Sequence, residues 1–395
     1  MNGQQYQAPE SVGRLQTGAL GVGGIAMVLA IFGALRSPGA FYESYLVSFL
    51  LVLGLSLGSL GLVMLQHLTS GHWGVIIRRP LESATRTLPL IAIFFLPIAL
   101  FGMKYLYAAW LDPQKLTEQP LSDFQHSYLT HGGYLTRAVT YFALWLALMF
   151  IFNRWSKQQD TNQNDRALRR RLQMLAGPGI ILYVFAMSFA AIDWVMSLSP
   201  HWASTIYGFI FVGGQLISSM SFMIAVVVLL SRAEPFASIV QPRHLHDLGK
   251  LLLAFVMLWA YFDFSQLLIV WSGNQPEEIS FYRTRLYGEW GVVAVIVVVF
   301  HFFVPFFLLL SQDLKRNAKI LTRIAMWLIL MRLVDLFWMT RPEFTSSAVP
   351  TWLDLVLPVA LGGLWLGFFA FNLKQCPLLP LGDPDLAKAI EHHEH

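Results

Sequence analysis

The sequence is poor in charge and in cysteine. Only 13% of its 395 residues are charged, whereas 56% are hydrophobic and the mean hydropathy is +0.55. Soluble domains carry about 25% charged residues, and disordered chains have fewer apolar residues still, so both classes are excluded. The single cysteine, Cys376, excludes an intramolecular disulfide and a cysteine-held zinc or iron–sulfur site within this chain.

Recognisable nucleotide-binding and hydrolase motifs are also lacking. No P-loop, Rossmann glycine pattern or nucleophile elbow occurs in a suitable strand–turn–helix context. The net charge of +4 and the pI near 9.1 do not indicate nucleic-acid binding, because the basic residues flank apolar stretches and form no basic face. No nucleic-acid partner is therefore expected.

Long apolar stretches dominate the sequence instead. A hydrocarbon core of roughly 30 Å is crossed by about 20 apolar helical residues, and ten stretches reach that length. We predict an all-α polytopic membrane protein that forms a single integral membrane domain over residues 1–395. The predicted spans are residues 15–35, 44–68, 88–110, 134–153, 174–198, 203–231, 249–272, 287–311, 319–340 and 351–372.

Lys and Arg are unequally divided between the two sides of these spans. The side that holds both chain ends carries 19 of them, and the other side carries five. Because cytoplasmic loops retain positive charge, we predict that both termini are cytoplasmic.

Apart from residues near the inner ends of the spans, nine ionisable side chains fall inside them, where a charge costs at least about 2.5–3.5 kcal/mol and a paired or functional role is expected. They are Lys104, Arg137, Asp193, Asp263, Glu289, His301, Arg332, Asp335 and Asp354. At about 1.5 Å per residue, most of them lie in the outer half of the membrane. We predict an outer polar pocket formed by Arg137, Asp193, Asp263 and Glu289.

Two interpretations of these buried groups stay open. In the first, Asp263, His301 and His67, which lies at the inner end of the second span, mark a proton route from the cytoplasm to the outer pocket. In the second, the groups form structural ion pairs, and Arg332 and Asp335 are the best candidates because a spacing of three residues puts them on one helix face. The two buried histidines form at most one pair, so neither a haem nor a metal site is predicted.

Glycine spacing and one outer connection give further expectations. Gly54 and Gly58, like Gly363 and Gly367, have the spacing of closely packed membrane helices. The connection over residues 273–287 mixes turn residues, charges and aromatics. It is expected either to dock an extracytoplasmic partner or to cap two helices.

Three segments resemble a known family. They are residues 67–79 (HLTSGHWGVIIRR), 193–208 (DWVMSLSPHWASTIYG) and 264–278 (FSQLLIVWSGNQPEE). They resemble signature segments of the ActF-type membrane subunit of bacterial alternative complex III, and the resemblance runs through nearly all the chain. That family is similar to the NrfD-like membrane subunits of polysulfide reductases.

The resemblance implies a fold and a set of partners. The implied fold has two four-helix bundles with flanking helices, in a bacterial cytoplasmic membrane. The implied complex oxidises quinol, with menaquinone or another quinone as its substrate. Electrons then pass through an extracytoplasmic iron–sulfur subunit and multihaem and monohaem cytochrome c subunits to a carrier or a terminal oxidase. A sister quinone-binding membrane subunit belongs to the same complex.

Within that complex this chain is expected to bind quinone, to guide protons, or both, with no haem or iron–sulfur cluster of its own. The candidate residues for quinone binding or proton transfer are Asp193, Asp263, Glu289, His301, Arg137, Lys104 and His67. An alternative is a secondary transporter with a polar substrate site between helical repeats. Ten spans, prolines within helices and buried charges suit it, although paired half-helices are not evident.

Overall fold

The computed structural model describes residues 6–71, 73–118, 120–161, 166–383 and 386, and the regular structure in these ranges is helical. Nine helical segments within them are long and apolar enough to cross a membrane. These are Glu10–Arg36 (α1), Pro38–Thr69 (α2), Trp73–Leu106 (α3 to α5), His131–Thr161 (α9), Arg166–Leu198 (α10 and η3), Tyr207–Leu230 (α11), Pro242–Gly273 (α13), Gly288–Leu310 (α15 to α16) and Trp352–Leu373 (α19). The prediction of an all-α, multi-pass membrane protein is confirmed.

Three of these segments change their helical geometry along their length. The first comprises α3 (Trp73–Thr85), α4 (Leu88–Pro97), the π-helical turn η2 (Ile98–Gly102) and α5 (Met103–Leu106). The second joins α10 (Arg166–Trp194) to the 3₁₀ turn η3 (Met196–Leu198), and the third joins α15 (Gly288–Val297), the π-helical turn η4 (Val298–Phe303) and α16 (Val304–Leu310). Pro97 and Pro305 lie beside the two π turns, where a missing backbone N–H leaves a carbonyl free.

The ninth predicted span (residues 319–340) forms a helix of matching length, α18 (Ala318–Thr340), which is not among these nine segments. Arg323, Arg332 and Asp335 lie along it, and the last two are buried. Helix α18 contacts α2, α11, α13 and α15, and Arg332 and Asp335 are turned toward protein, whereas Arg323 is exposed. A helix covered in this way does not need an apolar surface on every side.

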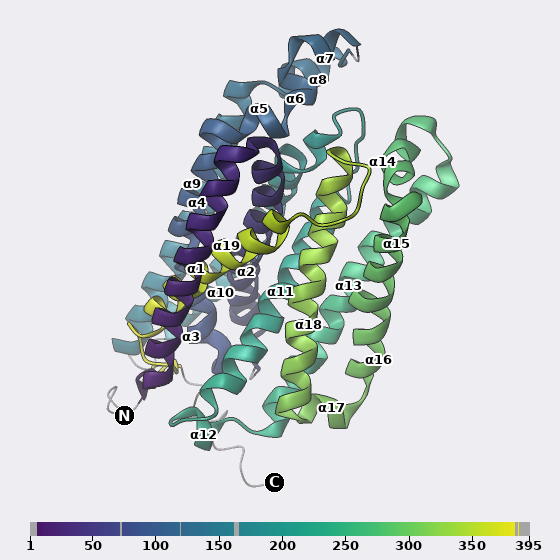
Figure 1. The fold of residues 1–395 in the computed structure, drawn as a ribbon. Coiled ribbons are helices and arrows are strands. Elements are labelled where there is room, and N and C mark those ends of the chain that lie inside the picture. The colour runs from purple at the N-terminus through teal and green to yellow at the C-terminus, as the bar shows by residue number, and fades with distance from the viewer. Residues whose placement is uncertain (1–5, 72, 119, 162–165, 384–385, 387–395) are drawn as a thin grey trace.

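Short helices form the connections. They are α6 (Ala108–Leu111), α7 (Pro113–Glu118), α8 (Asp123–Tyr128), α12 (Phe236–Ile239), α14 (Pro276–Leu286), α17 (Gln312–Arg316) and η5 (Arg341–Glu343). Figure 1 shows α7, α8 and α14 at one end of the molecule and α12 and α17 at the other. The 273–287 connection is thus largely a helix, α14.

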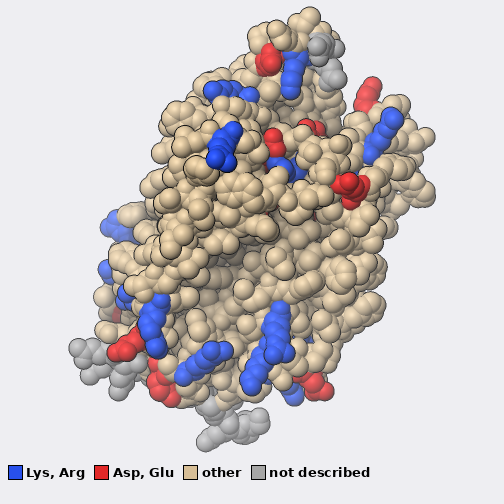
Figure 2. Space-filling model, in the orientation of Figure 1, with Lys and Arg blue, Asp and Glu red and all other residues tan. Residues whose placement is uncertain are grey.

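The two ends of the described chain lie together. The backbone N–H of Leu378 donates to the carbonyl of Tyr6 at 2.8 Å, and α1 begins near the end of the molecule at which α19 finishes (Figure 1). We call this the inner end and the opposite one the outer end. On the face drawn in Figure 2, charged residues gather toward both ends and leave an uncharged belt between them. Such a belt is what a hydrocarbon core requires.

Close backbone contacts join the long helices at glycines. Helix α1 crosses α19 where Gly23 faces Gly363, and a methyl group built on Gly363 would lie 2.8 Å from the Cα of Gly23. Helix α2 packs on α11 at Gly58, where a methyl group would overlap with the carbonyl oxygen of Gln215. Because lipid is as apolar as a leucine side chain, this close packing, and not hydrophobic burial, holds membrane helices together.

We therefore expect Gly58→Ala to destabilise the protein by about 1–3 kcal/mol, because the methyl group pushes α11 away from α2. Gly24→Ala is the matched control, since nothing lies within 4 Å of its added methyl group. The measurement is the temperature at which the detergent-solubilised protein loses its monodisperse elution peak. Equal midpoints for the two variants would contradict the close α2–α11 contact.

Candidate functional site

Four ionisable side chains come together between α13, η4 and α18, and we call them the central polar cluster. They are Asp263 from α13, His301 from η4, and Arg332 and Asp335 from α18. Nη1 of Arg332 forms an ion pair with Oδ2 of Asp335 inside the protein. Nδ1 of His301 lies 4.0 Å from the same oxygen, a separation too long for a hydrogen bond.

The imidazole of His301 is wholly enclosed, with 0% of its surface exposed. Its ring lies 4.3 Å from the ring of Trp259, between centroids. Neither ring nitrogen has a hydrogen-bond partner among the described residues. A buried polar group without a partner costs free energy, so this histidine calls for an explanation other than packing.

The π turn η4 and its surroundings position this histidine. Pro305 lacks the N–H that would otherwise bond to the carbonyl of His301. The indole N–H of Trp327 on α18 donates to the carbonyl of Phe300 in η4 at 2.9 Å. A neighbouring helix therefore supplies a hydrogen bond to one backbone carbonyl of the π turn. π turns within α-helices often occur at functional sites.

Asp263 is half-buried on α13 and makes no hydrogen bond or ion pair with any described residue. It interacts electrostatically with Arg332 and Asp335, which places it beside the ion pair without being part of it. Burial, aided by the carboxyl of Asp263, raises the pKa of the Tyr282 phenol on α14. Asp263 is therefore a carboxyl group on a membrane-spanning helix without a counter-charge in contact among the described residues.

Tyr207 of α11 connects this cluster electrostatically with the outer end. Its hydroxyl is buried and has no hydrogen-bond partner in the described chain. It interacts with the Arg332–Asp335 pair on one side and with Arg285 and Glu343 on the other.

Arg285 anchors α14 to η5 at the outer end. Its Nη1 lies 2.8 Å from Oε1 of Glu343, and its Nη2 donates to the carbonyl of Met339 at 2.8 Å. Its guanidinium also lies 3.5 Å from the ring centre of Phe281. Burial lowers the pKa of Arg285, and Glu343 partly offsets that effect, so the side chain remains a cation.

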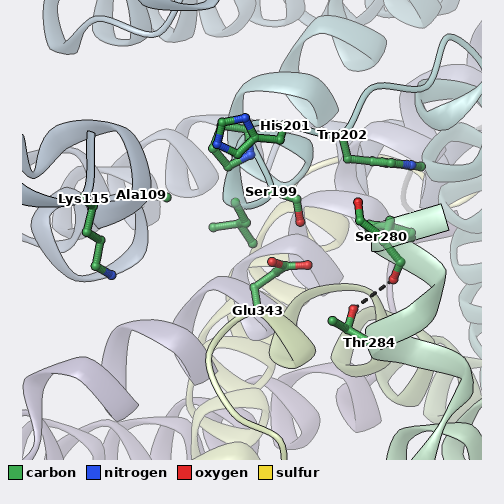
Figure 3. A pocket seen from close by; sticks show the side chains of 11 residues that line it. Ala109, Lys115, Ser199, His201, Trp202, Ser280, Thr284 and Glu343 are labelled. Atoms are coloured by element: carbon green, nitrogen blue, oxygen red, sulfur yellow. Dashed lines mark hydrogen bonds between the residues drawn. The ribbon is translucent and has the colours of Figure 1, made fainter. Parts of the chain in front are cut away.

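Glu343 also lines an outer pocket of about 580 Å³ between α6, α7, η3, α14 and η5 (Figure 3). Lys115, Ser199 and His201 add polar groups to its wall. Trp202 and Phe281 also line the pocket, as a stacked pair with ring centres 3.9 Å apart. The volume falls within the range of small-molecule sites, about 300–1,000 Å³.

Arg137 and Asp193 form a separate, fully bonded pair between α9 and α10. Nε of Arg137 lies 2.9 Å from Oδ2 of Asp193, and the Tyr141 hydroxyl donates to the same oxygen at 2.7 Å. The Arg137 guanidinium stacks 3.8 Å from the ring centre of Tyr128. Burial, together with Asp193, raises the pKa of Tyr128 to about 12.

The remaining predicted residues lie apart from the central polar cluster. Glu289 is exposed and accepts hydrogen bonds from the Ser347 hydroxyl at 3.0 Å and from the Ala348 N–H at 2.8 Å. Lys104 is exposed, with its amine 4.9 Å from the ring centre of Tyr105.

His67 and Asp354 lie at opposite ends of the bundle. His67 is buried at the inner end of α2, stacked on Phe152. Asp354 caps α19 and accepts a hydrogen bond from Ser44 at 2.6 Å. The structure thus brings Asp263 and His301 to one cluster, and it does not bring Arg137, Asp193, Glu289 or His67 to it.

Sequence reasoning missed a buried ionic network at the inner end. Arg78 and Arg79 of α3 both pair with Glu82, at 3.1 and 2.6 Å, and Arg79 also pairs with Asp160 of α9. The Ser156 hydroxyl donates to Glu82 at 2.5 Å. The spacing of three and four residues between these arginines and Glu82 was a signal that could have identified the network.

These contacts separate structural carboxylates from unpaired ones. We expect Asp193→Asn to destabilise the protein by about 1–3 kcal/mol, because Arg137 loses its counter-charge while remaining partly exposed at 23%. Asp263→Asn removes no described contact, so its midpoint should stay at the wild-type value. Thermal unfolding in detergent compares the two. A larger loss for Asp263→Asn would show that this carboxyl has a structural role.

Comparisons add no family assignment. The sequence matches no family model and no curated protein. Within the described ranges, no group of three or more His, Cys, Asp or Glu residues is arranged to hold a metal ion. The function is therefore inferred from the residues and contacts above, together with the resemblance of the three sequence segments.

Proposed function

We propose that the chain is a membrane subunit of a quinol-oxidising respiratory complex of the alternative complex III type, and that it conducts protons through the central polar cluster. The observation that carries the proposal is His301: it is enclosed, has no hydrogen-bond partner among the described residues, and lies 4.0 Å from Asp335. Asp263, which interacts electrostatically with the same Arg332–Asp335 pair, supplies a second protonatable group. An imidazole suits transfer because one ring nitrogen can accept a proton while the other donates one.

The proposed route runs outward from this cluster. Protons pass between Asp263, His301 and Asp335, then past the Tyr207 hydroxyl to Glu343, which opens into the outer pocket. The gap of 4.0 Å between His301 and Asp335 is closed by a side-chain movement or by water during transfer. Arg332 keeps Asp335 compensated, which lowers the cost of a carboxylate at this depth.

The outer pocket supports a role next to a quinol site. Oxidation of quinol releases two protons, which require an acceptor such as a carboxylate or an imidazole. Glu343 and His201 are groups of these types, and the stacked rings of Trp202 and Phe281 form an apolar part of the same wall. In this proposal the pocket lies beside a site for menaquinone or another quinone.

Two of the three segments that carry the resemblance lie at the proposed sites. Residues 193–208 contain Ser199, His201 and Trp202 of the outer pocket, and residues 264–278 begin directly after Asp263. We propose that α2, α3 to α5, α9 and α10 form one four-helix bundle and that α11, α13, α15 to α16 and α18 form the other. The contacts within each set, and the pairing of α1 with α19, support this arrangement.

The proposed surroundings follow from the same family. Both termini face the cytoplasm of a bacterial cell, and the outer end faces the extracytoplasmic iron–sulfur subunit. A sister membrane subunit oxidises the quinol, and cytochrome c subunits carry the electrons to a carrier or a terminal oxidase. The excess of Lys and Arg on the inner side supports this orientation.

In the purified complex, we expect Asp263→Asn to slow quinol-dependent proton release about tenfold or more, because general acid–base groups typically contribute 10²–10⁴-fold. The complex is reconstituted in liposomes, and external acidification is followed together with quinol turnover. Glu289→Gln is the control, since that carboxylate only caps a loop. Unchanged turnover and proton yield in Asp263→Asn, or substrate flux through this chain without quinol, would contradict the proposal.

Tyr207→Phe tests the outward half of the route. The hydroxyl makes no hydrogen bond with described residues, so its removal should leave the thermal midpoint unchanged and still slow proton release. Tyr183→Phe is the opposite control, because that hydroxyl donates to Gln215 at 2.7 Å and is not one of the groups in the proposed route. It should lower the midpoint without slowing proton release. The reverse pattern in the two variants would exclude Tyr207 from the pathway.

A further inference from the structure

A second cavity of about 580 Å³ lies at the inner end, and we call it the inner pocket. Its walls come from α3, α9 and the segment that follows α19, and it is distinct from the outer pocket and the central polar cluster. Arg79, Arg86, Arg154 and Lys157 line it, with Phe150 and Cys376 among its other residues.

The inner pocket carries an excess of positive charge. Asp160 is its only acidic lining residue in the described chain, and it already pairs with Arg79. Arg154 and Lys157 are exposed and form no ion pair with described residues. An anion is therefore the class of ligand that this charge favours.

One buried cation of the pocket has an unused donor. Arg79 is buried and lines the pocket, yet its Nε has no hydrogen-bond partner among the described residues. Its two terminal nitrogens are already bonded to Glu82 and Asp160. Arg79 therefore keeps one unbonded donor in the buried part of the wall.

The wall of the pocket also changes from apolar to cationic within one helical turn. Phe150, with 59% of its surface exposed, precedes Arg154 by four residues, so both lie on the same face of α9. The apolar run of α9 ends at Phe152, directly before Asn153 and Arg154. This is the surface expected where acyl chains meet phosphate groups.

We propose that the inner pocket binds an anionic phospholipid, with its phosphate among Arg86, Arg154 and Lys157 and an acyl chain along Phe150. Cations alone would suit any phosphate, whereas the exposed phenylalanine favours a ligand that also has an apolar part. Basic pockets between helices on the cytoplasmic side are a known form of lipid-headgroup site.

Cys376 provides the test, because it is the only cysteine in the chain and it lines this pocket. The full-length protein is placed in nanodiscs of phosphatidylcholine alone or with added phosphatidylglycerol, and alkylation of Cys376 by an uncharged maleimide is timed. We expect phosphatidylglycerol to slow alkylation about tenfold. Arg154→Gln with Lys157→Gln should abolish this protection, since each basic residue contributes roughly fivefold to binding of anionic lipid.

The control variant removes equal charge from the same end of the molecule. Arg232→Gln with Lys250→Gln alters two exposed cations outside the pocket and should keep the protection. Inorganic phosphate is added to phosphatidylcholine discs as a separate arm. Protection by phosphate alone, protection that survives in the Arg154/Lys157 variant, or equal rates in both lipids would overturn the proposal.

A second measurement does not depend on the reactivity of the cysteine. Lipid that remains bound to the protein after detergent purification is extracted and quantified by mass spectrometry. Phosphatidylglycerol should be enriched over phosphatidylcholine in the wild-type protein and in the Arg232/Lys250 variant. Loss of that enrichment only in the Arg154/Lys157 variant is the expected result, and equal enrichment in all three proteins would contradict a site at the inner pocket.

Discussion

The cost of an uncompensated charge in a low-dielectric interior organises this structure. Nearly every charge inside the bundle that we have described has a partner, often from another helix. Asp193 is held by Arg137, Glu82 by Arg78 and Arg79, and Glu43 by Arg341. Since breaking such a pair is costly, these contacts fix how the helices are rotated as well as how far apart they lie. Asp263 and His301 are exceptions, because neither has a hydrogen-bond partner among the described residues, and for this reason we assign them to the proposed proton route.

Glycine contacts and ion pairs hold different parts of the bundle together. Glycines bring backbones close where the helices are apolar, as at Gly58 of α2 and Gly363 of α19. Ion pairs connect helices and connections near the two ends, as with Arg285 and Glu343 at the outer end and Arg79 and Asp160 at the inner end. The middle of the membrane is thereby left mostly apolar, and the central polar cluster stands out within it.

The sequence predicted the spans well because bilayer thickness fixes their length independently of packing. It also identified Arg332 and Asp335 as a possible pair, because both lie on one helix three residues apart. It did not predict that Arg137 meets Asp193 or that His301 lies beside Asp335. Those contacts depend on how separate helices are rotated against each other. The π turn η4 adds to the difficulty, since it changes the angular phase that an ideal helix would give His301.

Gly214 of α11 shows how the packing and the central polar cluster depend on each other. A methyl group at this position would overlap with the guanidinium of Arg332, so the glycine provides the space that this cation occupies. Arg332 in turn compensates Asp335, the carboxylate nearest to His301. If Arg332 were displaced, Asp335 would be left as an uncompensated charge in the protein interior. In the proposed pathway, Gly214 on α11 therefore leaves the space in which Arg332 compensates Asp335, the proton acceptor on α18.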